Sequence, residues 1–584
     1  MQLIHRLRFP AFFCAMAVLL AELISRPFAE MGISDDGPYV AMAHTLATTG
    51  HILYTGWAAP MLVWQLYLAD FFIKLFGFSY STVRMSSLLI AIVMAWFLQR
   101  ILVRSGITER NATFGTLAVV LSPLYLVLSA TFLTDITGLF AIVICLYGCL
   151  RALQSPTDRR AIAWLCFAVI TNAIFGTSRQ IAWLGILVMV PSTLWLLRSR
   201  RRVLIGGGAA TLAGALFIFL CLQWLKLQPY SIPEHLIPTV FPFANPIAEI
   251  AHTIGEFVHT ILDVPFLLLP LFALFLPQIR KSRPRVQVII AAIALIYLLF
   301  AIHLRYSHPD FLLEPTAGAR GGWVGIHGIH EGTDLIGDPP IFLPTCLQIL
   351  ITIVSIGGLL GLLASFTRSH VSEVSTPVSP YPSVSWKQLA ILLAPYTAAY
   401  TLLLIPRATN ALFDRYMLGP VVILVLLLVR YYQNTISPRI PVAGVLLVAI
   451  MAVFGVVLTH NTFAFYRARV VLAAELHAAG IPDTSVDNGW EHNFDVELQH
   501  SDHINFPTIV VPANAYVPTP PLPPNTCTVF WYEYTPHIHP LFGVSFDPNG
   551  CYGPAPFAPV HYSRWLAHNP GTLYVVRYTP TIKH

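Results

Sequence analysis

Residues 33–52 read ISDDGPYVAMAHTLATTGHI, and the rest of the chain is organised around them. They follow the first long apolar segment and place two adjacent carboxylates, Asp35 and Asp36, where that segment ends. A carboxylate that is partly desolvated at a helix end can act as a general base or bind a cation. It can equally be a solvated loop residue that marks where a helix leaves the lipid, and spacing alone favours this plainer interpretation.

The composition is that of an integral membrane protein. Of the 584 residues, 56% are hydrophobic and only 11% are charged, which is less than half the charge content of a soluble domain. The mean hydropathy is +0.67. Apolar runs recur from residue 9 to about residue 459. Because roughly 17–25 residues cross a bilayer, we expect an all-α polytopic membrane protein with about 13 transmembrane helices.

The basic residues predict the orientation of these helices. Of the 34 Lys and Arg residues, 20 lie in seven short clusters between apolar runs, and such clusters are typical of cytoplasmic loops. The N-terminus is then cytoplasmic, residues 9–25 form an uncleaved anchor, and thirteen spans put the C-terminus outside. The net charge of +6 is not gathered into one patch with interleaved aromatics, which argues against a nucleic-acid partner.

This topology predicts a transmembrane domain over residues 1–459 and an extracytoplasmic C-terminal region over residues 460–584. A first outer loop over residues 29–83 carries the acidic stretch. Within it, residues 61–78 are apolar, but Asp70 and Lys74 lie four residues apart, which favours an interfacial helix over a span. Strand-like runs at 507–511, 528–534 and 572–578 predict a small α/β or β-rich C-terminal unit.

Two of the eight cysteines, Cys527 and Cys551, lie in this outer region. Disulfides persist outside the cytoplasm, so these two residues either form a bridge or remain as free thiols. The other six cysteines fall in or beside apolar runs, where packing explains them.

Three further residues on the outer side are candidates for function. Asp135 is a lone acid in an apolar context, which indicates a functional site, although an acid also caps a helix N-terminus. Arg179 lies in a minimal outer turn and either pairs with a phosphate or anchors the interface. Arg415 can bind an anionic headgroup bidentately, but its position by itself favours a local pair with Asp414 or an interfacial anchor.

The cytoplasmic loops contain neither a Walker A pattern nor a GxGxxG between a strand and a helix, which argues against chemistry driven by a soluble nucleotide. An activated substrate must then reach the outer face through the bilayer.

The third outer loop is a weak candidate for a metal site, because the spacing of its potential ligands matches no zinc pattern. Its potential ligands are His308, Asp310, His327, His330, Glu331, Asp334 and Asp338.

Together these residues resemble the GT-C superfamily of membrane glycosyltransferases, particularly the branch of protein O-mannosyltransferases and lipid A aminoarabinose transferases. The resemblance covers about residues 1–430. Four short motifs carry it in the order of the family: DDGPY at 35–39 with a small-residue helix ending at Gly50, TFLTDITG around Asp135, SRQ at 178–180 and DRYMLGP at 414–420. Asp36 stands where the family commonly has Glu, and the region from residue 460 does not resemble the mannosyltransferases' sugar-binding domain.

The resemblance implies a sugar donor on a polyprenyl phosphate and transfer, with inversion, to a lipid, glycan or protein acceptor on the outer face of the plasma or inner membrane. Asp35 would be the general base and Asp36 a supporting acid, while Asp135 would orient donor or acceptor. Arg179, Arg415, Tyr416 and Arg84 would hold the phosphate and lipid. A divalent cation is compatible with the acids but is not required by any motif.

Two other classes of function remain open. A transporter or flippase needs polar residues near the bilayer midplane, whereas the acids of this chain gather at the outer rim. A membrane scaffold or receptor would instead bind an extracellular partner through the C-terminal region. Substrate uptake by proteoliposomes without a covalent product would favour a transporter. Loss of function on deletion of the C-terminal region, but not on Asp35→Ala substitution, would favour a scaffold.

Overall fold

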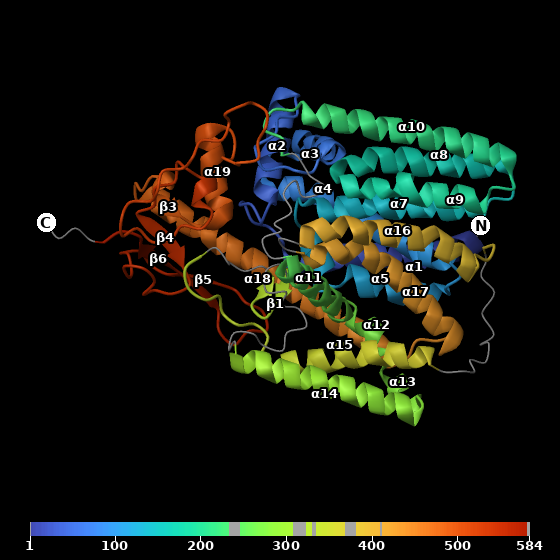
Figure 1. Ribbon diagram of the computed structural model, residues 1–584. Coiled ribbons are helices and arrows are strands. Elements are labelled where there is room, and N and C mark those ends of the chain that lie inside the picture. Colours follow the sequence, from blue (N-terminus) through green and yellow to red (C-terminus); the bar gives the residue numbers. More distant parts are fainter. Residues whose placement is uncertain are drawn as a thin grey trace.

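The computed structural model describes residues 2–232, 246–307, 323–329, 335–367, 381–408 and 412–580. Most of these residues form a helical bundle, and the C-terminal region lies at one end of it (Figure 1). The bundle contains α1 (Gln2–Ser25), α2 (Asp36–Thr49), α3 (Val63–Phe76), α4 (Tyr80–Arg104), α5 (Glu109–Val120), α6 (Pro123–Ser129), α7 (Thr134–Leu153), α8 (Asp158–Phe175), α9 (Val190–Leu196), α10 (Arg201–Lys226), α11 (Pro246–Leu267), α12 (Leu269–Ala273), α13 (Leu276–Lys281), α14 (Pro284–Ser307), α15 (Thr345–Phe366), α16 (Trp386–Ala408), α17 (Leu418–Thr435) and α18 (Val442–Ala478).

The predicted apolar spans are helical over most of their described lengths. Within the described ranges, eight helices are long and apolar enough to cross a membrane, or ten if each of two bent pairs is one span. One bent pair is α5 with α6, at an angle of 67°. The all-helical membrane fold is therefore confirmed, while the number of thirteen crossings stays a prediction.

Hydroxyl side chains cap several helices at their N-termini, where backbone amides lack partners within the helix. The Ser79 hydroxyl accepts a hydrogen bond from the Thr82 amide at the start of α4. Ser122 does the same for α6, whose first residue is Pro123. These caps separate consecutive apolar runs into helices of defined length.

Helix α3 lies within the first outer loop predicted from the sequence. Its buried face includes Trp64, Ala69 and Ile73, while the apolar side chains of Tyr67 and Phe71 are exposed. This helix is not one of the candidate spans. Its position in the membrane interface stays a prediction.

Helix α18 continues through the predicted domain boundary at residues 459 and 460 and ends at Ala478. Beyond it, α19 (Gly489–Ser501) packs against α2, as Figure 1 shows. A four-stranded sheet follows in the order β3-β4-β6-β5. Its strands are β3 (Val486–Asp487), β4 (Phe542–Ser545), β5 (Val560–Tyr562) and β6 (Gly571–Arg577).

Only the last of the three predicted strands is correct. Strand β6 pairs antiparallel with both β4 and β5. Its residues 571, 573, 575 and 576 are buried, while residues 572, 574 and 577 are partly exposed. Residues 507–511 and 528–534 are described but form no strand. The C-terminal region is nevertheless a mixed α/β unit, as the sequence predicts.

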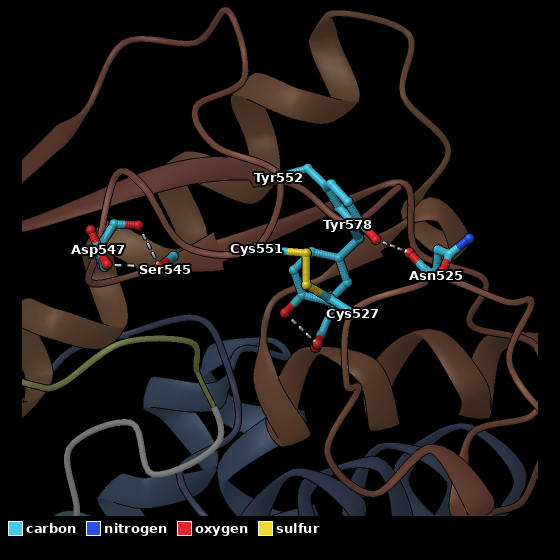
Figure 2. The surroundings of a disulfide bond; sticks show 8 residues. Asn525, Cys527, Ser545, Asp547, Cys551, Tyr552 and Tyr578 are labelled. Atoms are coloured by element: carbon cyan, nitrogen blue, oxygen red, sulfur yellow. Dashed lines mark hydrogen bonds between the residues drawn. A yellow bond between two sulfur atoms is a disulfide. The ribbon is translucent and has the colours of Figure 1, made fainter. Parts of the chain in front are cut away.

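Cys527 and Cys551 form a disulfide in this region (Figure 2). The backbone amide of Cys527 donates a hydrogen bond to the carbonyl oxygen of Tyr578, directly after β6. The hydroxyl of Tyr552 donates to the carbonyl oxygen of Asn525. The loop that contains Cys527 is thereby tied to the end of β6, a central strand of the sheet.

Candidate active site

The two adjacent acids point in different directions because a helix begins between them. Asp35 is the residue before α2 and makes no capping hydrogen bond within the described chain, whereas Asp36 is the first residue of the helix. The Asp35 side chain is 25% exposed and that of Asp36 is fully buried. Asp35 is therefore the acid that faces an open site.

Asp35 is held by two donors from distant segments. The indole Nε1 of Trp57 donates to its Oδ1 at 3.0 Å. The guanidinium of Arg415 donates to its Oδ2 at 3.1 Å. Each carboxylate oxygen retains a further lone pair, so Asp35 can still accept a proton or a hydrogen bond from a bound molecule.

Asp135 bridges two arginines. Its Oδ1 lies 2.6 Å from Nη1 of Arg179, and its Oδ2 lies 3.6 Å from Nη1 of Arg415. Asp135 is the second residue of α7, and the position before that helix is Leu133. The carboxylate is thus used for the arginines and does not cap the helix.

Arg179 lies in a break between α8 and α9. Two turns of 3-10 helix, η1 (Gly176–Ser178) and η2 (Gln180–Trp183), flank it, and a π-helical turn, η3 (Gly185–Met189), follows. The side chain of Asn172 donates to the carbonyl oxygen of Ala182 and accepts from the amide of Ile186. These bonds satisfy backbone groups that the broken helix leaves free.

Gly138, on α7, leaves space for the side chain of Arg179. A Cβ atom at this glycine would lie 3.2 Å from the Cβ of Arg179. Gly138 is also three residues after Asp135, so it lies on the same face of α7. The DITG motif therefore combines the acid with the space that its arginine partner occupies.

These groups meet at a cavity of about 230 Å³. The described residues that line it come from the first outer loop, the start of α7, the turn at Arg179, the segment after α10, the segment before α17 and the C-terminal region. They are Asp35, Tyr39, Trp57, Ala59, Pro60, Leu133, Thr134, Asp135, Arg179, Gln180, Ile232, Arg415, Tyr416 and Phe506.

Aromatic rings surround the two guanidinium groups. Arg179 lies over the ring of Tyr416, 4.8 Å from its centroid, and Arg415 lies 5.3 Å from the ring centroid of Trp323. Such contacts favour a cation in a partly dry site. Arg415 is 93% buried, and within the described residues its Nε has no hydrogen-bond partner.

Tyr39 contributes a hydroxyl to the same cavity. Burial, together with the nearby Asp35 carboxylate, raises the pKa of Tyr39 well above its ordinary value. The hydroxyl therefore stays protonated at neutral pH and is able to donate a hydrogen bond.

The structure brings together Asp35, Asp135, Arg179, Arg415 and Tyr416, but it places Asp36 and Arg84 apart from the cavity. Nε and Nη2 of Arg84 donate to the two carboxylate oxygens of Asp36 at 2.9 and 3.0 Å. Both side chains are at least 97% buried. The predicted roles of Asp36 as a supporting acid and of Arg84 as a phosphate ligand do not follow from this position.

Several lining residues were not candidates from the sequence, among them Trp57, Gln180 and Phe506. Gln180 belongs to the SRQ motif, and its Oε1 is buried without a hydrogen-bond partner among the described residues. Trp57 had no distinguishing pattern in its loop. Phe506 lies in the C-terminal region, far along the chain, so only the folded structure reveals its proximity.

Most of the predicted metal ligands of the third outer loop lie in parts of the chain that the structure does not describe. His308, Asp310, His330, Glu331 and Asp334 lie outside the described residues. Within the part of the chain that is described, no group of three or more His, Cys, Asp or Glu side chains is arranged to hold a metal ion.

A comparison with protein-family models gives one match. Residues 58–225 match the family described as dolichyl-phosphate-mannose-protein mannosyltransferase. This match supports membership of the chain in the GT-C superfamily of membrane glycosyltransferases. The matched segment includes Asp135 and Arg179, whereas Asp35 precedes it and Arg415 follows it.

Several solved structures of membrane glycosyltransferases show distant similarity to this chain. ArnT from Cupriavidus metallidurans bound to undecaprenyl phosphate is 14% identical, with a TM-score of 0.38 over 96% of this chain and 97% of that chain. AglB from Archaeoglobus fulgidus, in complex with an inhibitory peptide and a dolichol-phosphate, is 15% identical, with a TM-score of 0.40 over 90% and 64%.

The S. cerevisiae protein O-mannosyltransferase Pmt1-Pmt2 complex bound to the sugar donor is 16% identical, with a TM-score of 0.31 over 38% of this chain and 33% of that chain. TM-scores of this size do not by themselves establish a shared fold. Among curated proteins, none matches the sequence.

Proposed function

We propose that this protein transfers a sugar from a polyprenyl-phosphate donor to an acceptor on the extracytoplasmic face, with Asp35 as the general base. The observation that carries the proposal is the contact of Asp35 and Asp135 with Arg415, and of Asp135 with Arg179, at one cavity. A carboxylate beside two guanidinium groups provides a base for an acceptor and cations for a phosphate leaving group. The family description of residues 58–225 also names a lipid-phosphate sugar donor.

In the proposed reaction, ionised Asp35 takes the proton of an acceptor hydroxyl or amine as that group attacks the anomeric carbon. The bond between this carbon and the phosphate oxygen breaks, and its electron pair leaves with the polyprenyl phosphate. Attack opposite the leaving group inverts the configuration at the carbon. Arg179 and Arg415 stabilise the negative charge on the departing phosphate.

Arg415 has a central part in this scheme because it contacts both acids. Its pairing with Asp35 occupies one of the two carboxylate oxygens. A donor phosphate would compete for the same guanidinium, and the Nε, which has no partner among the described residues, offers a further hydrogen bond. Donor binding would thereby release Asp35 for proton abstraction.

Asp135 serves in this proposal as the group that spaces the two arginines. It is 95% buried and contacts both guanidinium groups, so it fixes their separation without reaching the acceptor. This differs from the sequence-based expectation that Asp135 orients donor or acceptor directly. The proposed steps use only these side chains, and none is routed through a metal ion.

The acceptor would approach Asp35 beside Trp57 and Phe506, which line the cavity; Trp57 contacts the carboxylate oxygen of Asp35 that Arg415 does not. The ring centroids of Trp57 and Phe506 are 5.1 Å apart in an edge-to-face arrangement. Apolar ring faces beside a base carboxylate favour an acceptor that presents a hydroxyl or amine on an apolar framework.

Sugar transfer from a labelled polyprenyl-phosphate donor, measured in membranes containing the full-length protein, tests this proposal. Asp35→Asn retains the shape of the side chain but removes the base, and we expect kcat to fall by about 10²–10⁴-fold. Glu475→Gln is the matched control, because Glu475 is an exposed acid on α18. Turnover by Asp35→Asn at the wild-type rate would exclude Asp35 as the base, and substrate uptake without a covalent product would indicate a transporter.

A further inference from the structure

The C-terminal region contacts the backbone of the acidic motif directly. The carboxylate of Glu491, on α19, accepts a hydrogen bond from the amide of Ser34 at 3.1 Å, although 457 residues separate the two. On the same helix, Nε1 of Trp490 donates to the carbonyl oxygen of Ser34 at 3.3 Å. Helix α19 therefore binds both backbone polar groups of the residue that precedes Asp35.

Ser34 has an unusual backbone conformation. Its φ angle is +54°, in the left-handed region that residues other than glycine rarely adopt. A residue in this region persists only when its surroundings hold it there. The two hydrogen bonds from α19 are contacts of that kind, because they fix the directions of the amide and carbonyl groups on either side of the Ser34 Cα atom.

Glu491 is itself rigidly held. Its Oε1 also accepts from the hydroxyl of Tyr466 at 2.6 Å, and its Oε2 lies 2.9 Å from Nη1 of Arg469. Glu491 is 95% buried and Arg469 is 99% buried. Both partners lie on α18, which extends from the helical bundle, so the carboxylate that holds Ser34 is anchored to the bundle itself.

The conformation of Ser34 determines where the two acids point. Asp35 and Asp36 follow it immediately, and a change to a right-handed or extended conformation would redirect the chain at both residues. Asp35 would then lose its hydrogen bonds to Trp57 and Arg415. A shift of about 1 Å in a reacting group is enough to lower a rate by about 10²-fold.

We propose that Glu491 is a positioning residue for the transfer reaction: it holds Ser34 in the left-handed conformation and thereby directs Asp35 into the cavity. This role rests on the proposed function, because it assumes that Asp35 is the base. It also gives the C-terminal region a part in catalysis, because Glu491 positions Asp35 without itself taking part in the chemical step.

The test compares Glu491→Ala with the double variant Ser34→Gly/Glu491→Ala in the full-length protein. Glu491→Ala removes the acceptor of the Ser34 amide, and we expect kcat to fall by about 10²-fold while KM for the donor changes by less than about threefold. Glycine adopts positive φ without the steric penalty of serine. The double variant should therefore recover at least tenfold of the lost kcat, roughly the advantage of glycine in this conformation.

A purely structural role for Glu491 gives a different result. If its loss only reduced the amount of folded protein, the activity per folded molecule would be unchanged, and Ser34→Gly would restore nothing. Folded protein is quantified by size-exclusion chromatography in detergent, and Tyr552→Phe, at an exposed site beside the disulfide, controls for substitution in the C-terminal region.

The two proposals fail in distinguishable ways. Wild-type kcat in Glu491→Ala, with Asp35→Asn inactive, would overturn the positioning role and leave the base assignment intact. Absence of rescue by Ser34→Gly at normal protein yield would also overturn it. Activity in Asp35→Asn would instead overturn the proposed function on which the positioning role depends.

Discussion

At the scale of single residues, Asp36 and Arg84 form a closed pair beside the candidate site. Among the described residues, Asp36 accepts two hydrogen bonds from Arg84 and one each from the backbone amides of Ile33 and Phe132. Arg84 also donates to the carbonyl oxygens of Ala29 and Met31. The pair joins the acidic stretch to α4 and to the segment before α7, so we expect it to stabilise the packing of these segments.

We therefore predict that substitutions at the two adjacent acids change the stability of the protein by very different amounts. Asp36→Asn leaves the buried Arg84 without a charged partner, which costs about 3–5 kcal/mol of unfolding free energy. Asp35→Asn should change that free energy by less than about 1 kcal/mol, because the side chain is only partly buried. Denaturant unfolding in detergent measures both. Equal loss of stability in the two variants would contradict the separate roles.

The sequence identifies both acids, but their adjacency does not distinguish them, and only the family resemblance gives them different roles. Their partners, Arg84 and Arg415, lie 48 and 380 residues away, and the pairing depends on how four segments pack. Short motifs around Asp135, Arg179 and Arg415 predicted a group of residues that the structure brings together. Burial, which differs between Asp35 and Asp36, is a property of the folded chain.

Asp495 predicts a pH dependence of stability. Burial, reinforced by the nearby Asp36, raises its pKa from 3.8 to about 7, and the Tyr80 hydroxyl donates to its Oδ2 at 2.5 Å. Between about pH 4 and 7 the folded protein holds a proton that the unfolded chain has lost, so this group's contribution to stability decreases as pH rises through that range.

Asp495→Asn should remove this slope while keeping an oxygen that accepts from Tyr80. Burial lowers the pKa of the neighbouring His492 from 6.5 to about 4, so that residue contributes the opposite slope below its ordinary pKa. The informative quantity is consequently the difference between variant and wild type. Thermal unfolding from about pH 4 to 8 measures it, and a constant difference would show that Asp495 does not titrate in this range.

At the scale of elements, the first outer loop and the C-terminal region meet at Gly56. The amide of Ile504 donates to the carbonyl oxygen of Thr55 at 2.7 Å, and the amide of Gly56 donates to the carbonyl oxygen of Tyr230. A Cβ atom at Gly56 would lie 2.5 Å from the carbonyl oxygen of Ile504. Only glycine permits this approach, which brings Phe506 to the edge of the cavity.

Gly56→Ala should destabilise this junction by more than the cost of its positive φ. Gly50→Ala is the matched control, because Gly50 has a similar φ of 76° but no described atom within 4 Å of the place where an alanine methyl group would lie. We expect a loss of about 1–2 kcal/mol at Gly50 and a larger loss at Gly56. Amide hydrogen exchange at Ile504 should accelerate only in Gly56→Ala, and equal exchange in both variants would refute the close contact.

Helix α18 extends beyond residue 459, where the hydropathy of the sequence predicts the end of the membrane domain. Hydropathy falls after residue 458, and this fall predicts the end of a membrane span. The helix continues because its later residues, including Phe463, Phe465 and Leu472, pack against the C-terminal sheet. Apolar packing on a protein surface replaces burial in lipid along one continuous helix, and composition alone does not separate these two environments.

At the scale of the whole molecule, the cavity is lined by residues from segments that lie far apart in the sequence. Its lining includes the first outer loop, Ile232 after α10, Arg415 before α17 and Phe506 in the C-terminal region. The sequence predicts that all of these lie on the extracytoplasmic side, because the basic clusters lie in the opposite loops. Because these residues line one cavity, they must lie on the same side of the membrane. The charge pattern of the loops independently predicts the same arrangement.

The orientation itself can be tested by the accessibility of single cysteines. In a Cys346→Ser background, which removes an exposed free thiol, Asn569→Cys places a thiol at an exposed position of the C-terminal region and Arg159→Cys places one at an exposed position in the first turn of α8. A membrane-impermeant maleimide should label Asn569→Cys in intact cells, and Arg159→Cys only after permeabilisation. The reverse pattern would place the cavity in the cytoplasm, where a donor carried to the outer leaflet could not reach Arg179 and Arg415.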